Sequence, residues 1–365
     1  MTTNFSRLKI IVAALDWGLG HASRMIPIIE YFLRKDYQVA IASSGNALKL
    51  LQNRFPDLLS FELSSYNIEY KHSSMVWEMT RQLPKIFKVR NTENQQLKRI
   101  LNDFDADLII SDNRYGFYNK KIKSIFITHQ LQILGPKSFS FINPILKKLH
   151  IRLLSRFEQI WVPDFYGSNS LAGVLSNVDN ISANIKYIGP LSRFYKVKSN
   201  SSNVLNEINN IVVILSGPEP ARTIFENKII FQLEDFNGKL VLLRGLPNNK
   251  EVIINDRIEV YNHLNDDKLL PILQEADVVI SRSGYSSLMD MYFLSKKSIF
   301  IPTKGQTEQE YLAERFMSKK MFYSQKEENL DLKLALSEVK KYSGFVDKQN
   351  ISFDIIDKAL EELGF

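Results

Sequence analysis

Short apolar runs recur along the first half of the chain and alternate with amphipathic segments. A run in which nearly every residue is apolar predicts a strand covered on both faces, as in a parallel sheet. Such strands are predicted at residues 9–15, 39–42, 107–114, 125–130, 158–163 and 185–190. Amphipathic segments that open at Ala22 and at Gly45 predict helices after the first two strands. This alternation is typical of an α/β domain of the Rossmann-like kind.

The same alternation restarts after a polar stretch at residues 196–203, which we interpret as a linker. Further strands are predicted at 211–215, 240–243, 259–264, 275–280 and 299–302, with helices at 266–273 and after Gly284. A chain of 365 residues is long enough for two cores. We therefore predict an N-terminal domain over residues 1–195 and a C-terminal domain over 204–348. An amphipathic segment at 349–364 predicts a final helix.

Composition narrows the class of protein. The chain has no cysteine, which excludes disulfides, thiolate catalysis and Cys-ligated metal and fits a reducing cytoplasm. Its net charge of +7 predicts attraction to anionic surfaces or ligands, whereas no nucleic-acid-binding motif is present. No apolar run approaches the length of a membrane span, and the first residues lack a signal-peptide pattern. We expect a cytoplasmic protein, soluble or peripheral on a membrane.

The strongest candidate for a ligand site is a strand, turn and helix within residues 281–311. The backbone N–H groups and the positive dipole at a helix N-terminus favour an anion at such a turn. Ligands of open α/β sheets bind at the carboxyl ends of the strands, which is where these polar residues fall. The candidate ligand-binding residues are Arg282, Ser283, Gly284, Ser286, Ser287, Asp290, Gln309 and Glu310.

A second candidate site follows the first strand, where Gly18, Gly20 and His21 form a glycine-rich turn ahead of Arg24. A histidine titrates near neutral pH and can act as a general base. A helix-capping histidine remains the alternative. Asp112, at the exit of a later strand, could orient His21 or could simply cap a turn. His129 and Gln130 lie at the mouth of the next strand and are further candidates for this second site, together with Gly18, Gly20 and Arg24.

These motifs resemble those of glycosyltransferase family 28. In that family an R-S-G turn precedes a helical acid that binds the ribose, and a Gln-rich pair after the next strand binds hydroxyls of the donor hexose. The matching positions here are Arg282-Ser283-Gly284, Asp290, Gln309 and Glu310. Two residues depart from the pattern, because Asp290 replaces the usual Glu and Glu310 replaces a second Gln. The second departure leaves the identity of the sugar open.

The resemblance implies a GT-B fold, in which two Rossmann-like domains face a cleft. The C-terminal domain would bind a nucleotide diphospho-sugar, expected to be UDP-linked. The N-terminal domain would bind the acceptor, with the acceptor-side candidates Gly18, Gly20, Arg24, His129 and Gln130. Ser216, Gly217 and Arg222 match the loop that contacts the diphosphate, although Arg222 is equally consistent with a surface residue. His263 matches a position beside the uracil ring. The final helix commonly crosses back to the first domain in this fold.

The expected activity is inverting transfer of a hexose from a UDP-sugar to a hydroxyl acceptor, such as a lipid or a cell-envelope glycan precursor. His21 would be the base, and no metal or other cofactor is expected. The D-x-D sequence Asp105-Ala106-Asp107 precedes its strand and is interpreted as a solvated loop. Two alternatives stay open. One is a nucleotide-sugar hydrolase of the same fold, because the G-x-G-H-x-x-R sequence of this chain resembles the loop of such an enzyme. The other is a non-catalytic nucleotide-sugar-binding subunit.

Two basic segments with interleaved aromatic residues, 71–100 and 137–156, raise the possibility of a membrane surface as partner. The second predicts an amphipathic helix from about Pro144, with Lys and Arg on one face. Such a helix can dock on anionic lipid. The alternative is a helix whose apolar face covers the core while its lysines are solvated.

Overall fold

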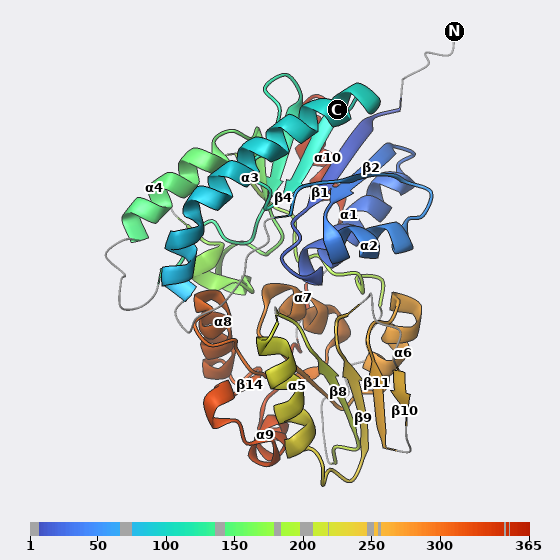
Figure 1. The fold of residues 1–365 in the computed structure, drawn as a ribbon, viewed down its shortest axis with the longest axis vertical. Coiled ribbons are helices and arrows are strands. Elements are labelled where there is room, and N and C mark those ends of the chain that lie inside the picture. The colour runs from blue at the N-terminus through green and yellow to red at the C-terminus, as the bar shows by residue number, and fades with distance from the viewer. Residues whose placement is uncertain are drawn as a thin grey trace. The chain divides into compact units, whose positions relative to one another are not determined.

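The computed structural model describes residues 7–65, 75–135, 143–178, 184–197, 207–217, 219–246, 252–254, 257–346, 348–349 and 351–365. The chain divides into two compact units (Figure 1). Unit 1 holds the described residues of 1–68, 76–192 and 350–365, and unit 2 holds those of 69–75 and 193–349. Each unit is built around its own parallel sheet and is described below by itself.

Unit 1 is built on a seven-stranded sheet in the order β3-β2-β1-β4-β5-β6-β7, with every pairing parallel. The strands are β1 Lys9–Ala14, β2 Gln38–Ser43, β3 Leu59–Glu62, β4 Leu108–Asp112, β5 Lys123–Ile127, β6 Gln159–Val162 and β7 Ile185–Tyr187. The strand order reverses direction between β1 and β4, which makes the carboxyl ends of these two strands the switch point of the sheet.

The helices of unit 1 cover this sheet and supply its core. They are α1 Leu19–Arg34, α2 Gly45–Arg54, α3 Met75–Asp103, α4 Asn143–Leu154 and α10 Asp354–Glu361, with short 3-10 turns at Gly167–Asn169 and Gly173–Leu175. Leu97 and Ile100 of α3 pack against Ile11 and Ile109 of the central strands. Because these apolar positions are three residues apart, they form one stripe on the helix.

Helix α10 packs on unit 1 although it follows unit 2 in sequence. The side-chain amide of Gln159 donates to the Ala359 carbonyl at 2.8 Å, and Lys35 forms an ion pair with Asp357 at 2.9 Å. Ile356 is fully buried. The helix spans Asp354–Glu361, so it is shorter than the predicted segment 349–364, of which the residues before Asp354 are not helical where they are described.

Unit 2 is built on a second seven-stranded sheet, in the order β10-β11-β9-β8-β12-β13-β14. The strands are β8 Asn210–Ile214, β9 Lys239–Leu243, β10 Val252–Ile254, β11 Ile258–Tyr261, β12 Val278–Ser281, β13 Lys297–Phe300 and β14 Tyr323–Ser324. Of these described strands, β10 pairs antiparallel with β11, and the remaining pairings are parallel.

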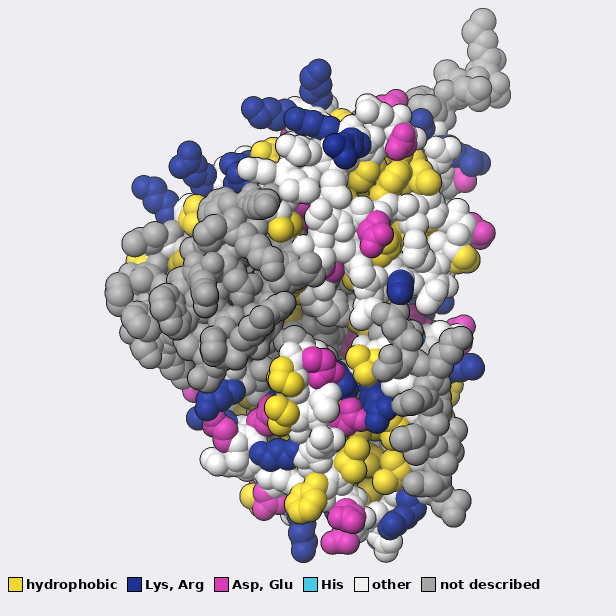
Figure 2. All heavy atoms as spheres, viewed as in Figure 1, with side chains coloured by type: hydrophobic (Ala, Val, Ile, Leu, Met, Phe, Trp, Pro, Cys, Tyr) yellow, Lys and Arg dark blue, Asp and Glu magenta, His cyan; other side chains and the backbone are white. Residues whose placement is uncertain are grey.

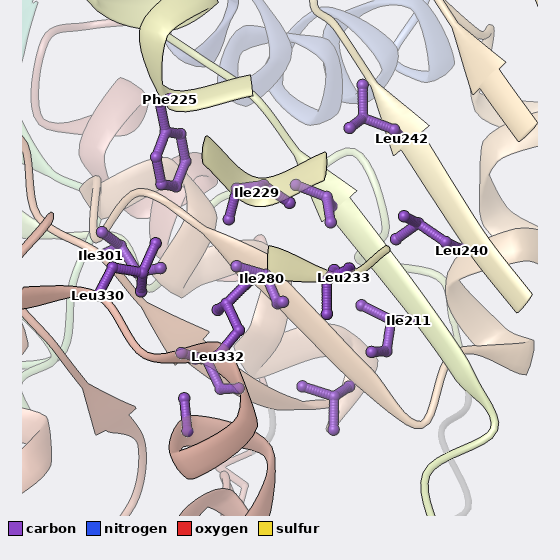
Figure 3. Close-up of a cluster of buried hydrophobic side chains, with 14 of the residues drawn as sticks. Ile211, Phe225, Ile229, Leu233, Leu240, Leu242, Ile280, Ile301, Leu330 and Leu332 are labelled. Atoms are coloured by element: carbon purple, nitrogen blue, oxygen red, sulfur yellow. The ribbon is translucent and has the colours of Figure 1, made fainter. Parts of the chain in front are cut away.

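The helices of unit 2 are α5 Ala221–Gln232, α6 Asp266–Glu275, α7 Tyr285–Leu294, α8 Thr307–Ser318 and α9 Leu332–Glu338, with 3-10 turns at Glu327–Asn329 and Val339–Lys341. Phe225 and Ile229 lie one helical turn apart on α5, and Leu233 follows at its end. They pack on strand residues such as Ile211 and Leu240 (Figure 3). This apolar layer fixes α5 over the sheet and thereby places the loop after β8.

Most predicted elements agree with the structure within a few residues. The predicted strand 275–280 is wrong at its start, because Glu275 still belongs to α6 and β12 begins at Val278. The α6 helix is capped by the Asn265 side chain, which accepts a hydrogen bond from the backbone N–H of Lys268. The linker prediction at 196–203 falls outside the described residues, apart from 196 and 197. Among the helices described, none is long and apolar enough to cross a membrane.

Candidate functional site

The turn between β1 and α1 places His21 at the switch point of the unit 1 sheet. Gly18 has φ +77°, a left-handed conformation that glycine adopts without steric cost, and it forms the N-cap of α1. The helix begins at Leu19, so Gly20 and His21 lie in its first turn. The predicted helix start at Ala22 is therefore corrected, and His21 is held by a helix and not by a loop.

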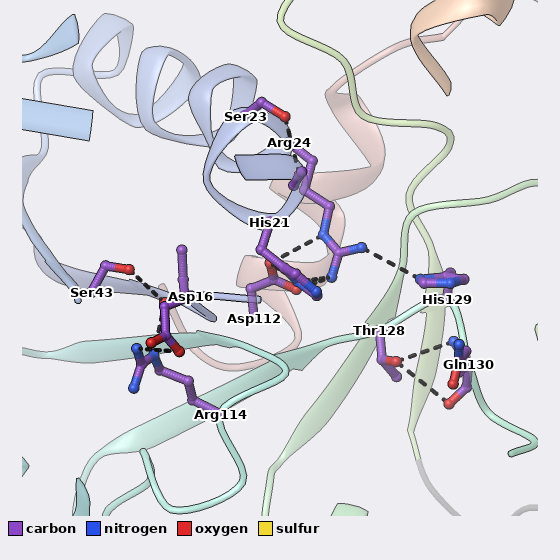
Figure 4. A network of polar contacts seen from close by, with 12 residues as sticks. Asp16, His21, Ser23, Arg24, Ser43, Asp112, Arg114, Thr128, His129 and Gln130 are labelled. Atoms are coloured by element: carbon purple, nitrogen blue, oxygen red, sulfur yellow. Dashed lines mark hydrogen bonds and ion pairs between the residues drawn. The ribbon is translucent and has the colours of Figure 1, made fainter. Parts of the chain in front are cut away.

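The structure brings His21 and Asp112 into contact. Asp112 is the last residue of β4 and pairs in register with Ala14 of β1, so the strand itself delivers the carboxylate to the start of α1. The His21 Nδ1 atom lies 3.0 Å from the Asp112 Oδ2 atom (Figure 4). The Asp112 side chain is fully buried and the His21 side chain is 17% exposed. This is the geometry of a histidine oriented by a carboxylate.

Arg24 completes this cluster, one helical turn beyond His21. Its Nε atom donates to Asp112 Oδ2 at 3.1 Å, and its Nη2 atom donates to Asp112 Oδ1. The Nη2 atom also lies 2.8 Å from His21 Nδ1, and the Nη1 atom lies 3.4 Å from Nδ1 of His129. The side chain is 2% exposed. Arg24 was predicted on the acceptor side, but the structure directs its guanidinium into the interior of unit 1, against Asp112.

Burial and charge set the protonation states in this cluster. Burial lowers the pKa of His21, Arg24 lowers it further, and Asp112 opposes both, with a lowered pKa as the net result. Burial alone would raise the pKa of Asp112, but the charges of Arg24 and His21 and their hydrogen bonds outweigh it, so this pKa is also lowered. Near neutral pH, His21 is therefore neutral and Asp112 is ionised.

The two other acceptor-side candidates follow β5 beside this cluster. His129 is 5% exposed. The backbone N–H of Gln130 donates to Thr128 Oγ1 at 3.1 Å (Figure 4). His129 thus reaches Arg24 from the neighbouring strand, whereas Gln130 is fixed through its backbone.

Sequence reasoning missed a second buried network beneath the β1–α1 turn. Arg114 is fully buried, and its guanidinium donates to the Ala14 carbonyl at 2.7 Å, to Glu93 at 2.8 Å and to the Ser44 hydroxyl at 2.8 Å. It also lies 3.5 Å from Asp16, the first residue of the glycine-rich turn after Leu15. Arg114 follows a strand, like many surface arginines, so nothing in the sequence alone marked it. The network braces the turn that carries His21.

In unit 2, the predicted donor turn follows β12 directly. Gly284 is the N-cap of α7 and has no side chain that could cap the helix. Ser286 and Ser287 occupy the first turn of α7, and Asp290 lies one turn further along, half-buried. The turn therefore has the strand, glycine and helix order of an anion site.

Arg282 and Ser283 tie this turn to the loop after β13. The Arg282 Nη1 atom donates to the Ile301 carbonyl at 3.1 Å, and the Ser283 hydroxyl donates to the Gln309 carbonyl at 2.8 Å. The two halves of the predicted donor motif are thus joined. Arg282 itself is 2% exposed, lies 3.8 Å from the Phe225 ring centroid and forms an ion pair with Glu327 at 2.7 Å. Its charged group faces the interior of unit 2.

Gln309 and Glu310 lie in the first turn of α8, and their side chains fold back onto the loop that precedes it. Gln309 Oε1 accepts a hydrogen bond from the Thr303 N–H at 2.8 Å, and Glu310 Oε1 accepts one from the Gly305 N–H at 2.9 Å. These bonds fix the shape of the loop between β13 and α8. A ligand that bonds to these side chains would meet groups already held in place.

The loop after β8 holds Ser216 and Gly217, and Gly217 has φ +108°, a conformation open to glycine. Arg222, the predicted diphosphate contact, is paired with carboxylates. Its side chain is 7% exposed, with Nη1 2.8 Å from Glu226 and Nε 2.6 Å from Glu219. The guanidinium is engaged by carboxylates at the start of α5.

His263 follows β11 and is half-buried. Burial lowers its pKa, Arg193 lowers it further, and Asp266 opposes both. Arg193 forms an ion pair with Asp266 at 2.9 Å within the same unit. A neutral, half-buried imidazole has the character needed to face a nucleobase.

The D-x-D sequence takes part in the fold. The Asp107 carboxylate accepts a hydrogen bond from the backbone N–H of Lys9 at 2.9 Å, which fixes the entry to β1 and β4. Within the described part of the chain, no group of three or more His, Asp or Glu residues is arranged to hold a metal ion.

Residues 223–344, most of unit 2, match the glycosyltransferase family 28 C-terminal domain. The chain is a glycosyltransferase of the family 28 type. An uncharacterized glycosyltransferase from Methanosarcina acetivorans is 19% identical over 316 residues, which cover 83% of this chain and 82% of that protein. A second relative of this glycosyltransferase comes from Rickettsia akari. It is the UDP-N-acetylglucosamine–N-acetylmuramyl-(pentapeptide) pyrophosphoryl-undecaprenol N-acetylglucosamine transferase, 22% identical over 80% of this chain and 78% of its own length.

The solved structures confirm the fold of this family 28-type glycosyltransferase. The glycotransferase of kitacinnamycin superposes with a TM-score of 0.62 at 14% identity, covering 98% of this chain and 95% of that one. Such a likeness establishes the GT-B fold that the motifs at 16–24 and 281–311 implied.

Proposed function

We propose that the enzyme transfers a hexose from a UDP-sugar to a hydroxyl acceptor, with inversion and with His21 as general base. The observation that carries this proposal is the contact between His21 Nδ1 and buried, ionised Asp112 at 3.0 Å. Nδ1 also lies 2.8 Å from Arg24 Nη2, which can only donate, so we take the tautomer in which Nδ1–H donates to Asp112 and the lone pair of the ring lies on Nε2. A neutral imidazole in this tautomer can accept a proton from an alcohol.

The reaction then balances as a single displacement. His21 Nε2 takes the proton of the acceptor hydroxyl as its oxygen forms a bond to the anomeric carbon. The bond from that carbon to the diphosphate oxygen breaks on the opposite face, and its electron pair leaves with UDP. The imidazolium is stabilised by Asp112, and it returns its proton to solvent after product release.

The donor would be held by unit 2. The N-terminus of α7, with Ser286 and Ser287, and the loop with Ser216 and Gly217 suit the charge of a diphosphate. Asp290 would bind the ribose and His263 the base, as the family resemblance implies. Gln309 and Glu310 would bind hexose hydroxyls. The choice of UDP is supported by the name of the Rickettsia akari relative, which specifies a UDP-linked donor.

A lipid-linked acceptor is part of the same proposal. The Rickettsia akari relative acts, by its name, on a pyrophosphoryl-undecaprenol substrate. Helix α4, predicted from its charges to be amphipathic, exposes Lys148, Leu149 and Arg152. Figure 2 shows Lys and Arg side chains over this side of unit 1, near α3 and α4. Basic side chains beside exposed apolar ones suit the headgroup region of an anionic membrane.

The test starts with thermal unfolding of the protein in the presence of UDP, GDP, dTDP or CMP. A ligand at about a hundred times its dissociation constant stabilises by about 2.7 kcal/mol. A shift with UDP alone supports the donor, and no shift with any nucleotide contradicts the donor site. UDP-sugars are then tested for UDP release with and without lipid and sugar acceptors.

Two variants separate binding from chemistry. His21→Ala should lose at least a hundredfold in turnover while UDP still shifts the melting temperature. The matched control His263→Ala should weaken UDP binding and leave a measurable turnover. Full activity of His21→Ala would remove His21 from the mechanism. UDP release that no acceptor accelerates would instead identify a hydrolase, and UDP-sugar binding without any turnover would identify a binding subunit.

A further inference from the structure

Arg24 holds Asp112 at two points. Its Nε and Nη2 atoms donate to Oδ2 and Oδ1 of the carboxylate, and both side chains are almost completely buried. His21 and Arg24 lie three residues apart on α1, so the helix presents both to the same carboxylate. A planar guanidinium that binds both oxygens of a carboxylate fixes its plane, which a lysine cannot do.

These two hydrogen bonds fix the orientation of the Asp112 carboxylate. The terminal torsion of an aspartate is soft, so an unbraced carboxylate samples many orientations. Here Oδ2, the oxygen held by Arg24 Nε, is also the one that lies 3.0 Å from His21 Nδ1. The orientation of the imidazole therefore depends on Asp112 and on Arg24 Nη2, which lies 2.8 Å from the same Nδ1, and the orientation of Asp112 depends on Arg24.

The same residue balances the charge around the imidazole. Three groups act on His21, and they come from three elements: Arg24 from α1, Asp112 from the end of β4, and His129 from the segment after β5. Asp112 alone would favour the imidazolium, because an opposite charge in contact stabilises the protonated ring. The buried guanidinium offsets that charge.

We infer that Arg24 is a positioning residue. It fixes the orientation of Asp112 and offsets its charge, so that His21 stays a neutral base, and together with Asp112 it sets the ring tautomer, because both side chains lie within hydrogen-bond distance of Nδ1. The inference deepens the proposed function and rests on it for its catalytic meaning. The arrangement of the three side chains stands independently of turnover.

The experiment is NMR titration of His21 in the full chain with 15N-labelled histidine, which reports both the tautomer and the pKa of the ring. His21→Gln serves to assign the signal. Arg24→Gln should raise the pKa of His21 by about one pH unit, since the charge of Asp112 is no longer offset. Arg24→Lys keeps the charge, so the pKa should stay near that of the wild type while the signals show a mixture of tautomers.

The double variant Arg24→Gln/Asp112→Asn removes both charges, so that no unpaired charge is left buried. Burial still acts on His21 in this protein, so the pKa should fall back below that of Arg24→Gln. In an active preparation, the acid limb of kcat/KM should move up with the pKa in Arg24→Gln. Arg24→Lys should lose kcat about tenfold or more with little change in KM.

The inference is overturned if the pKa and the tautomer of His21 are the same in the wild type and in folded Arg24→Gln, with activity following only the folded fraction. This outcome is distinct from failure of the proposed function. If His21→Ala retains full turnover, the NMR result still decides whether Arg24 sets the state of the ring.

Discussion

His150 should make the stability of unit 1 depend on pH. It lies on α4 and is 2% exposed, with Nδ1 3.2 Å from the Leu131 carbonyl and Nε2 2.9 Å from the Tyr115 hydroxyl. The carbonyl accepts only, so Nδ1 carries the proton and Nε2 accepts from the Tyr115 O–H. Burial lowers the pKa of His150 from 6.5 to about 4, a shift that the bond to Leu131 only partly opposes.

The sign and size follow from linkage. The unfolded chain binds a proton at His150 below about pH 6.5, whereas the folded chain does so only near pH 4. The contribution is therefore complete above about pH 6.5 and is lost as the pH falls toward 4. Integrating over this window gives a loss of about 2 kcal/mol between pH 7 and pH 5, and about 3 kcal/mol by pH 4.

The assay is urea unfolding followed by the fluorescence of Trp161, which is fully buried in unit 1, at several pH values from 7 to 5. The comparison protein is His150→Gln, which can still accept from Tyr115 but does not titrate. His21 also has a lowered pKa and acts in the same direction, so the informative quantity is the difference between the two proteins. Equal losses of stability in both would refute the reasoning.

Three further predictions concern the backbone and the buried charges. Asp164 is fully buried and accepts hydrogen bonds from three backbone N–H groups and two serine hydroxyls. Asp164→Asn should therefore destabilise unit 1 by about 3 kcal/mol in urea unfolding, with Asp164→Glu as the charge-matched comparison. Gly18→Ala should cost about 1–3 kcal/mol, because φ +77° with ψ 178° is a region that almost only glycine enters. It should also lower kcat by displacing the first turn of α1, and unchanged kinetics would contradict this. Arg222→Met should lower the melting temperature of unit 2, because Glu226 loses a partner. The Kd for UDP, measured by calorimetry, should change less than threefold, and a larger change would support Arg222 as a diphosphate contact.

Most of the fold could be predicted from the sequence, because buried parallel strands appear as continuous apolar runs. Continuous apolar runs such as Ile10–Ala14 are buried on both faces of the sheet, as expected for parallel strands. Boundaries were less accurate where a cap competed with the pattern. Helix α1 begins at Leu19, three residues before Ala22, where the apolar periodicity begins. The run predicted as a strand from Glu275 includes the last residue of α6.

The candidate site was foreseen in its residue types and only partly in its contacts. A strand register places Asp112 beside Ala14, which is why a partner for His21 could be expected at the end of a later strand. The direction of an arginine side chain has no such signature. Arg24, Arg222 and Arg282 all turn inward to carboxylates, because a buried guanidinium needs a paired acid. The partners of Arg24 and Arg282, Asp112 and Glu327, are distant in the sequence, whereas Glu219 and Glu226 lie only three and four residues from Arg222.

The return of α10 to unit 1 has a consequence for biosynthesis. The residues of unit 2 between 193 and 349 are contiguous, so this unit can acquire its core as soon as it leaves the ribosome. Unit 1 is complete only once α10 is present, since the bond between Gln159 and Ala359 joins residues 200 positions apart. The nascent chain would thus carry a first sheet that lacks α10 until residues 354–361 have been made.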